Sequence, residues 1–559
     1  MTNRIVIDAE TGWNTPRKPG HSPPGEDAGP GGLPPKESVA VAEFSHVRRF
    51  VVMTPRALLS LVLASCVLVL LASSSSCASL PGDSGAARDV GGVFTAVFTW
   101  FEAAVEYMFG MIAGGDGGGK GAKGKRRAAI TKNRGRTYTN YQVLRLRPTT
   151  DEDVQELKTL EDEHGLEFWS PPVKNGTSDL MIPPDVSEYL REYLQDRDIE
   201  FTVLTNDLEA EIKKQNPKPK SKYSEKLLKT DKGHPLTWAR FHRYKDILDY
   251  LDYLGSTIPD LVKIVTIGKS SENRPLKVAH ISSGKRKDAP AIWIDGGIHG
   301  REWVAPSTAL FILKQLTENY NTNKAVVDGI DWFIMPVANP DGYEYSHSVD
   351  RFWRKNRSKN PAKRYEDYYD EARYGRFFWG DDAETCQGVD LNRNWDFHWK
   401  EIGASSSPCK PTFAGDRPFS EPETRAMSDF IMDRSDQIKA YLSLHSYSQM
   451  LLLPWGYTKQ NPKDYDDLMY VGRKAVEALQ RLYGTPYKIG TSPSLLYPTS
   501  GSSDDWAKGK AGIKYSYTLE LRDKGTHGFL LPASQIVPTG RETFAAIKTI
   551  AKHVVNTSD

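Results

Sequence analysis

The chain has 559 residues, with 73 basic against 71 acidic side chains and a formal net charge of +2. This near-neutral balance gives no general electrostatic reason to expect a nucleic-acid partner. The length exceeds that of one typical domain, and 39% hydrophobic residues are enough to build a packed core.

The N-terminal region resembles an export signal preceded by a tail. Residues 1–52 are rich in proline and glycine, which predicts disorder. The apolar run at 57–72 would form a helix of about 24 Å, shorter than the roughly 30 Å hydrocarbon core of a membrane. With a basic start and small residues after the run, segment 53–79 fits a signal peptide. Two interpretations stay open: translation from Met53 with a cleaved signal and secretion, or an uncleaved single-pass membrane anchor.

Residues 80–136 are predicted to form a helix followed by a linker. Polar side chains within 90–113 recur on one helical face, which predicts an amphipathic helix. Because that polar face is acidic, packing against a partner is favoured over binding to an anionic membrane. The rest of the region is rich first in glycine and then in basic residues, as flexible linkers are.

Segment 137–212 alternates between the two kinds of secondary structure. The pattern predicts strands at 141–146, 167–169, 179–182 and 200–204, and helices at 150–164 and 183–196. The order β-α-β-β-α-β is that of a ferredoxin-like α+β unit.

Two regions complete the chain. Residues 213–232 contain eight lysines and two prolines, which predicts an exposed linker open to a trypsin-like protease. Residues 233–559 alternate helices with apolar strands, which predicts a mixed-sheet α/β/α domain.

Pairs of the form His-x-x-acid are the first sign of chemistry. Roughly one or two should arise by chance with 12 His and 71 acidic residues, and four occur. Three are predicted to be ordinary solvated pairs: His164–Glu167, His347–Asp350 and His398–Glu401. His299–Glu302 differs, because it follows an apolar strand broken by Gly296 and Gly297, where α/β proteins place their sites.

Two more strands end in reactive side chains. His445 follows the apolar segment 440–444, and Glu520 follows the alternating segment 515–519. A buried histidine without a ligand role is the alternative for His445. Two histidines and one carboxylate can hold zinc with one position open for water. The pair Asn392-Arg393 offers donors suited to a carboxylate, so the set indicates hydrolysis next to a free C-terminus.

These segments and their order resemble the zinc metallocarboxypeptidases of the A/B type. The likeness covers about residues 235–555 as the peptidase and about 138–212 as its inhibitory propeptide. The segments that carry it are His299-Gly300-Arg301-Glu302-Trp303, Arg351-Phe352-Trp353-Arg354-Lys355, Gly388-Val389-Asp390-Leu391-Asn392-Arg393-Asn394-Trp395-Asp396, Leu444-His445-Ser446-Tyr447-Ser448-Gln449 and Thr518-Leu519-Glu520-Leu521-Arg522-Asp523.

The resemblance implies one zinc ion and a role for each site residue. Zinc would be held by His299, Glu302 and His445, with Asp390 fixing the first histidine, Glu520 as general base and Arg354 facing the oxyanion. The substrate carboxylate would contact Asn392, Arg393 and Tyr497, and upstream substrate residues would contact Arg301 and Tyr447. Simpler alternatives are a turn aspartate at 390, a solvated basic run around 354 and a packing tyrosine at 497.

Specificity is predicted from Asp504. By resemblance it lies at the floor of the pocket for the last side chain, where A-type enzymes carry an apolar residue, and Ser492 leaves room for a long chain. A buried carboxylate favours a cationic partner, so the chain resembles the B type, which prefers C-terminal Lys or Arg. The neighbouring Asp505 is predicted to cap a helix. An A-type preference or a catalytically inactive binding protein is the alternative.

The remaining predictions concern partners and covalent features. Peptide C-termini would be substrates, the propeptide an inhibitor and a trypsin-like protease the activator. Signal cleavage would leave Cys386 and Cys409, which resemble the family's disulfide pair, with free thiols as the alternative. Segment 358–385 is longer than relatives usually have. Glycosylation sequons, compatible with secretion, occur at Asn175, Asn356 and Asn556.

Overall fold

The computed structural model describes residues 135–164, 166–217, 234, 236–359 and 386–557. The predicted signal at 57–72, the helix at 90–113 and nearly all of segment 358–385 lie outside these residues. Within the described ranges, no helix is both long and apolar enough to cross a membrane.

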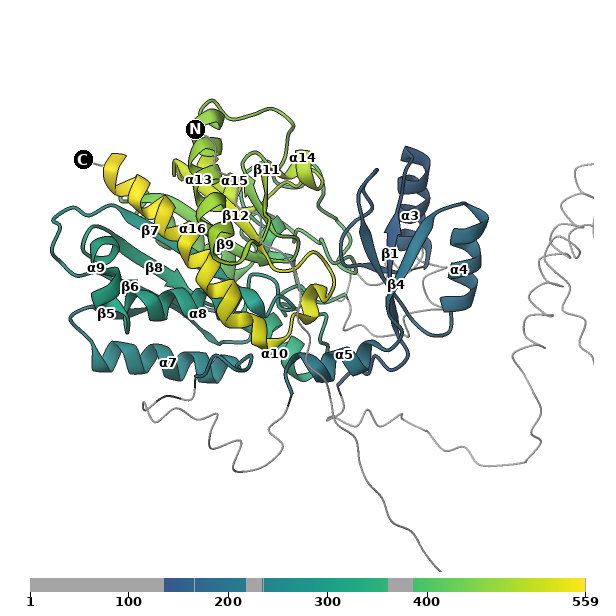
Figure 1. Cartoon of the computed structure of the whole chain (residues 1–559), viewed down its shortest axis with the longest axis horizontal. Helices are drawn as coiled ribbons and strands as arrows, with labels where there is room; N and C mark the ends of the chain where they lie inside the picture. Colours follow the sequence, from purple (N-terminus) through teal and green to yellow (C-terminus); the bar gives the residue numbers. More distant parts are fainter. Residues whose placement is uncertain (1–134, 165, 218–233, 235, 360–385, 558–559) are drawn as a thin grey trace, which may run out of the picture. The chain divides into compact units, whose positions relative to one another are not determined.

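The small domain (residues 135–217), drawn in dark blue in Figure 1, has the predicted β-α-β-β-α-β order. Its antiparallel sheet has the strand order β2-β3-β1-β4. The elements are β1 (Gln142–Arg147), α3 (Asp151–His164), β2 (Glu167–Phe168), β3 (Ser178–Ile182), α4 (Ser187–Asp196) and β4 (Glu200–Thr205). One helix was not predicted: α5 (Leu208–Gln215) spans the end of segment 137–212 and the first three residues of the expected linker, and its first turn is capped by Asp207.

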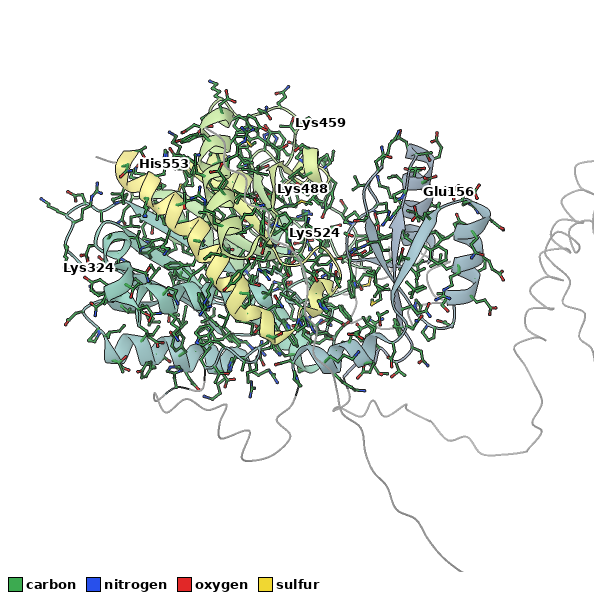
Figure 2. The ribbon with its side chains drawn as sticks, viewed as in Figure 1. Glu156, Lys324, Lys459, Lys488, Lys524 and His553 are labelled. Atoms are coloured by element: carbon green, nitrogen blue, oxygen red, sulfur yellow. A yellow bond between two sulfur atoms is a disulfide. The ribbon has the colours of Figure 1, made fainter. Side chains whose placement is uncertain are left out.

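Short-range contacts explain why the two longer helices of the small domain form where they do. Thr150 and Asp153 bond reciprocally at the start of α3, each side chain reaching the other's backbone N–H at 3.0 Å, which is a capping-box arrangement. Glu156 on α3, labelled in Figure 2, lies on the side of the small domain where the two helices are. It accepts hydrogen bonds from Tyr193 at 2.5 Å and Arg197 at 3.2 Å, which ties α3 to α4. Leucines from both helices then pack on one face of the sheet.

The large domain (residues 236–557) contains an eight-stranded mixed sheet of order β11-β10-β12-β9-β7-β8-β6-β5. Four neighbouring strands, β12, β9, β7 and β8, run parallel. The strands are β5 (Val262–Lys269), β6 (Pro275–Ile281), β7 (Ala291–Gly296), β8 (Asp331–Met335), β9 (Ile438–Ser446), β10 (Met450–Leu453), β11 (Lys488–Thr491) and β12 (Tyr515–Leu521).

Helices cover both faces of this sheet, which makes the predicted α/β/α layers. Alternation along β7 shows the two faces: Ile292 and Ile294 join one core, and Trp293 joins the other. The first core lies under α7 (Tyr244–Thr257), α8 (Val304–Leu316), α9 (Tyr320–Asp328), α13 (Tyr465–Tyr483) and α16 (Ile536–Thr557). The second lies under α12 (Pro422–Met432) and α15 (Ser503–Gly509). Between β8 and α12, the chain forms α10 (Pro340–Ser348) and the 3-10 turn η2 (Leu391–Arg393).

The three sequons differ in accessibility. Asn356 is fully buried, and its amide donates to the Ser271 hydroxyl and to the carboxylates of Glu421 and Glu423. An oligosaccharyltransferase could not reach it in the folded chain. Asn175 and Asn556 are exposed.

The carboxylate of Glu423 generates a stability prediction. Burial raises its pKa to about 7, and the nearby Glu421 and Asp341 charges act in the same direction, although the Ser271 backbone opposes them. The folded protein therefore holds this proton more tightly than the unfolded chain does. The resulting stabilisation is present below the ordinary carboxyl pKa and is lost as pH rises through 7.

We therefore expect Glu423→Gln, which cannot ionise, to gain stability relative to the wild type between pH 5 and pH 8. The relative gain should be on the order of 3 kcal/mol, read as a growing difference between the two melting temperatures. If that difference stayed constant over this pH range, Glu423 would not carry the proton.

Candidate functional site

The parallel strands of the large domain bring the candidate residues together. His299 lies on the loop after β7, His445 lies near the end of β9, and Glu520 lies near the end of β12. Strands β12 and β9 pair in parallel with Glu520 opposite His445. Since parallel strands end at the same edge of a sheet, these side chains are neighbours although they are far apart in sequence.

His299, Glu302 and His445 converge on one point. The Nδ1 atom of His299 lies 2.7 Å from Glu302 Oε1, and the Nδ1 atom of His445 lies 3.1 Å from Glu302 Oε2. One ligand atom from each residue lies within 4.8 Å of the others, and all three residues are buried. Two imidazole nitrogens and a carboxylate oxygen are the donor set of open zinc sites, so these residues fit the metal.

Asp390 lies behind this triad. Its Oδ1 atom is 3.2 Å from His299 Nε2, and its Oδ2 atom accepts bonds from Arg354 Nε at 3.0 Å and Nη2 at 2.8 Å. Burial alone would raise the pKa of Asp390, but Arg354 and His299 hold it well below the usual range. An ionised carboxylate on Nε2 leaves the Nδ1 atom of His299 directed toward the triad.

Glu520 lies half-buried beside the triad. Burial raises its pKa to about 7; the Glu302 charge adds to the shift and the His445 ring opposes it. Among the described residues, none donates a hydrogen bond to its carboxylate. The side chain is therefore a carboxylate available to exchange a proton.

Asn392 and Arg393 are held on η2 by surrounding backbone. The Asn392 Oδ1 atom accepts a bond from Ser503 N at 2.9 Å, and Arg393 Nε donates to the Gly403 carbonyl at 2.8 Å. Both residues are largely buried. Tyr497 is half-buried and lies near Arg354. Burial lowers the pKa of the Arg354 guanidinium, but Asp390 and, after it, Tyr497 raise that pKa above its ordinary value. The structure thus gathers the residues predicted for carboxylate binding near Arg354 and the start of α15.

The two neighbouring aspartates of α15 differ in what they contact. Asp504 is 7% exposed, and no cation pairs with its carboxylate among the described residues. The prediction that Asp505 caps the helix is wrong. Both of its oxygens accept from the N–H of Gly456 at 2.9 Å, and Oδ2 also accepts from Tyr457 at 3.1 Å. These donors belong to the loop after β10, and the N-cap residue of α15 makes no side-chain capping bond.

The small domain occupies two residues predicted to contact substrate. Arg301 forms an ion pair with Glu167, and the Tyr447 hydroxyl donates to Asp179 at 2.5 Å. Arg145 also binds Asp179, with both carboxylate oxygens engaged at 2.7 and 2.8 Å. Trp169 packs against Phe529 of the large domain. Carboxylates of the small domain therefore engage the two residues for which substrate contact was predicted.

The three predicted solvated pairs differ in what the structure shows. Glu167 forms an ion pair with Arg301, whereas the side chain of its predicted partner, His164, lies outside what the structure describes. The ring of His347 stacks on Trp303 at 3.8 Å, and burial holds its pKa well below the usual value. Its predicted partner Asp350 instead accepts a bond from Tyr138. His398 and Glu401 do pair at 2.9 Å near the surface.

Sequence reasoning missed Arg145, Glu167 and Asp179 as functional candidates. Asp179 alone left a signal, because it is a charged residue inside an apolar strand and is 1% exposed. A buried charge needs a partner, so its position could have indicated an interface. Arg145 and Glu167 alternate with apolar residues as solvent-facing strand residues do.

A disulfide joins Cys386 to Cys409 in the large domain. It closes the chain around η2, which carries Asn392 and Arg393. The two cysteines are therefore not free thiols.

Two known protein families match the chain. Residues 247–546 match the zinc carboxypeptidase family, and residues 144–215 match the carboxypeptidase activation peptide. The two matches fall on the large and the small domain.

Individual relatives agree with these matches. Carboxypeptidase B of Astacus astacus is 43% identical over 322 residues, which are 58% of this chain and 99% of that protein. Carboxypeptidase A1 of Bos taurus is 39% identical over 425 residues, or 75% of this chain and 95% of that protein. The crystal structure of thrombin activatable fibrinolysis inhibitor superposes with a TM-score of 0.66 at 34% identity, covering 75% of this chain and all of that one. The chain therefore belongs to the zinc carboxypeptidase family, and its small domain is the activation peptide of that family.

Proposed function

We propose that this zymogen metallocarboxypeptidase removes C-terminal Lys or Arg from peptides and proteins. The observation that carries the proposal is the Asp504 carboxylate, which is 7% exposed and has no cation beside it among the described residues. The Asp504 charge also repels the ionised forms of Glu520 and Asp505, and so contributes to raising the pKa of each after the larger effect of burial. A cationic side chain would relieve this repulsion, whereas an apolar one would leave a desolvated charge unpaired.

The residues of the site fit a hydrolytic role. Zinc held by His299, Glu302 and His445 would polarise the scissile carbonyl and a water molecule. The Glu520 carboxylate would accept the proton from that water and pass it to the leaving amine. Arg354, held by Asp390, would donate to the carbonyl oxygen as negative charge develops on it.

Substrate position would come from two groups of residues. Asn392, Arg393 and Tyr497 would bind the terminal carboxylate, which limits cleavage to the last residue. On the other side of the bond, Arg301 and Tyr447 would contact upstream residues once the activation peptide has left. These two residues are those that Glu167 and Asp179 engage in the zymogen.

Activation would require a trypsin-like protease acting in a secretory setting. The lysine-rich stretch of 213–232 supplies its targets, mostly outside the described residues. Lys213 and Lys214 lie in α5, so sites beyond residue 217 are favoured. The Cys386–Cys409 disulfide and the exposed sequons at Asn175 and Asn556 support secretion.

Replacement of the proposed base should separate metal binding from turnover. Glu520→Gln keeps the shape of the side chain but cannot accept a proton at neutral pH. We expect it to retain zinc, measured by metal analysis, and to lose at least about a hundredfold in kcat. Near-normal turnover with bound zinc would remove Glu520 from the role of base.

Latency should depend on the activation peptide. The uncut protein should be nearly inactive on long peptides, and limited trypsin should release activity together with a resistant large domain. Glu167→Gln, which weakens the pair with Arg301, should raise the activity of uncut protein. Full activity before cleavage would contradict inhibition by the small domain.

The charge at position 504 should decide specificity. We expect the wild type to favour a C-terminal Arg over Phe by orders of magnitude in kcat/KM, and Asp504→Ile to reverse this order while keeping zinc. A matched series of peptides that differ only in the last residue would measure both. An unchanged preference for Arg in the variant would refute the assignment of Asp504.

A further inference from the structure

The start of α15 joins three parts of the site through three consecutive residues. Ser503 N donates to the Asn392 side chain at 2.9 Å. The Asp504 carbonyl accepts a bond from the Ser516 hydroxyl at 2.8 Å, which ties it to β12. Asp505 alone reaches a third segment, the loop after β10, through its side chain.

The loop that Asp505 contacts has a glycine, Gly456, at the point of contact. A side chain at Gly456 would bring a Cβ atom within 2.9 Å of the Thr499 hydroxyl and 3.3 Å of Asp505 Oδ2. The Gly456 N–H points at Asp505, and its carbonyl accepts a bond from Thr499 N at 2.9 Å. Gly456 is therefore held by hydrogen bonds through both its N–H and its carbonyl, and Asp505 is the acceptor for the N–H.

The same connections continue toward the carboxylate-binding residues. Ser500 N donates to the Ile402 carbonyl at 2.9 Å, and its hydroxyl accepts a bond from Ile402 N at 3.1 Å. The next residue, Gly403, accepts the bond from Arg393 Nε. A continuous set of hydrogen bonds thus runs from Asp505 through Gly456 and the 499–500 segment to Arg393.

We propose that Asp505 is a positioning residue for substrate binding: its carboxylate holds the Gly456–Tyr457 backbone and thereby sets the distance between Asp504 and Arg393. A C-terminal residue must reach both of these groups at once, with its side chain at Asp504 and its carboxylate at Arg393. Loosening the connection weakens binding of the last residue without removing the proposed catalytic groups. The inference rests on the proposed function for the choice of an Arg-ended substrate.

The test compares Asp505→Ala with Asp505→Asn in the trypsin-activated enzyme. Alanine leaves the N–H groups of Gly456 and Tyr457 without acceptors, whereas asparagine keeps one acceptor oxygen. For an Arg-ended peptide we expect KM to rise roughly tenfold or more in the alanine variant and less in the asparagine variant, with kcat within about threefold of wild type. The inhibition constant of free arginine should rise in parallel.

A matched control removes a buried carboxylate elsewhere. Asp341 is fully buried and accepts a bond from Glu272 N at 2.8 Å, far in sequence from α15. Asp341→Asn should lower the melting temperature but leave KM unchanged, because no hydrogen bond or ion pair among the described residues joins Asp341 to Gly456 or Arg393. If Asp505→Ala lowers the melting temperature in the same way and leaves both KM and the arginine constant within twofold of wild type, the positioning role is refuted.

The design keeps this inference separate from the proposed specificity. If the wild type prefers Phe-ended peptides, the proposed function fails. The positioning role is then decided by the Phe-ended peptide, whose KM must rise in Asp505→Ala for the role to stand. If the alanine variant is not produced, the asparagine variant decides the question by the same criterion.

Discussion

The buried carboxylate of Asp390 is the contact on which the arrangement of the site depends. It is fully buried and meets three groups at once: the His299 ring, the Arg354 guanidinium and the backbone N–H of Asn392. Each partner belongs to a different proposed function: metal binding, oxyanion stabilisation and carboxylate binding. A single ionised group therefore fixes the relative positions of all three.

The charge of Asp390 is stable in that position because its partners compensate it. An isolated carboxylate would not remain ionised at such depth. Two charge-assisted bonds from one guanidinium lower the cost of burial and also fix the plane of Arg354. The same pairing holds Arg354 in place, so the proposed oxyanion donor would already be positioned before a substrate arrives, as electrostatic stabilisation requires.

Much of the fold and of the metal site was predictable because both follow from local pattern. The alternation of apolar residues predicted the elements of the small domain. The endings of the strands before His299, His445 and Glu520 predicted one shared edge. Long-range partners were not predictable in the same way: Glu167 looks like any polar strand residue until Arg301, 134 positions away, is placed beside it.

The error at Asp505 has a similar physical cause. An aspartate in the first turn of a helix fits a capping role on local grounds. In the structure, however, both Asp505 oxygens accept hydrogen bonds from N–H groups of another loop. Likewise α5 was not predicted, because its residues were divided between the end of segment 137–212 and the lysine-rich linker. Its helix is completed by contacts that sequence does not display: the Gln215 side chain is buried and bonds to Arg351 and the Phe529 carbonyl.

The proposed inhibition and the proposed specificity involve different residues of the site. The activation peptide engages Arg301 and Tyr447, while no hydrogen bond or ion pair joins its described residues to Asn392, Arg393 or Asp504. The groups proposed to bind the last residue of a substrate thus belong to the large domain and are held by hydrogen bonds within that domain. In the proposed function, removal of the activation peptide would change access for the upstream part of a substrate, whereas the contacts of Asn392, Arg393 and Asp504 within the large domain are already formed in the zymogen. Changes at Asp504 should therefore alter which substrates are cut without altering latency. The reason is that, among the described residues, no hydrogen bond or ion pair joins Asp504 to the activation peptide.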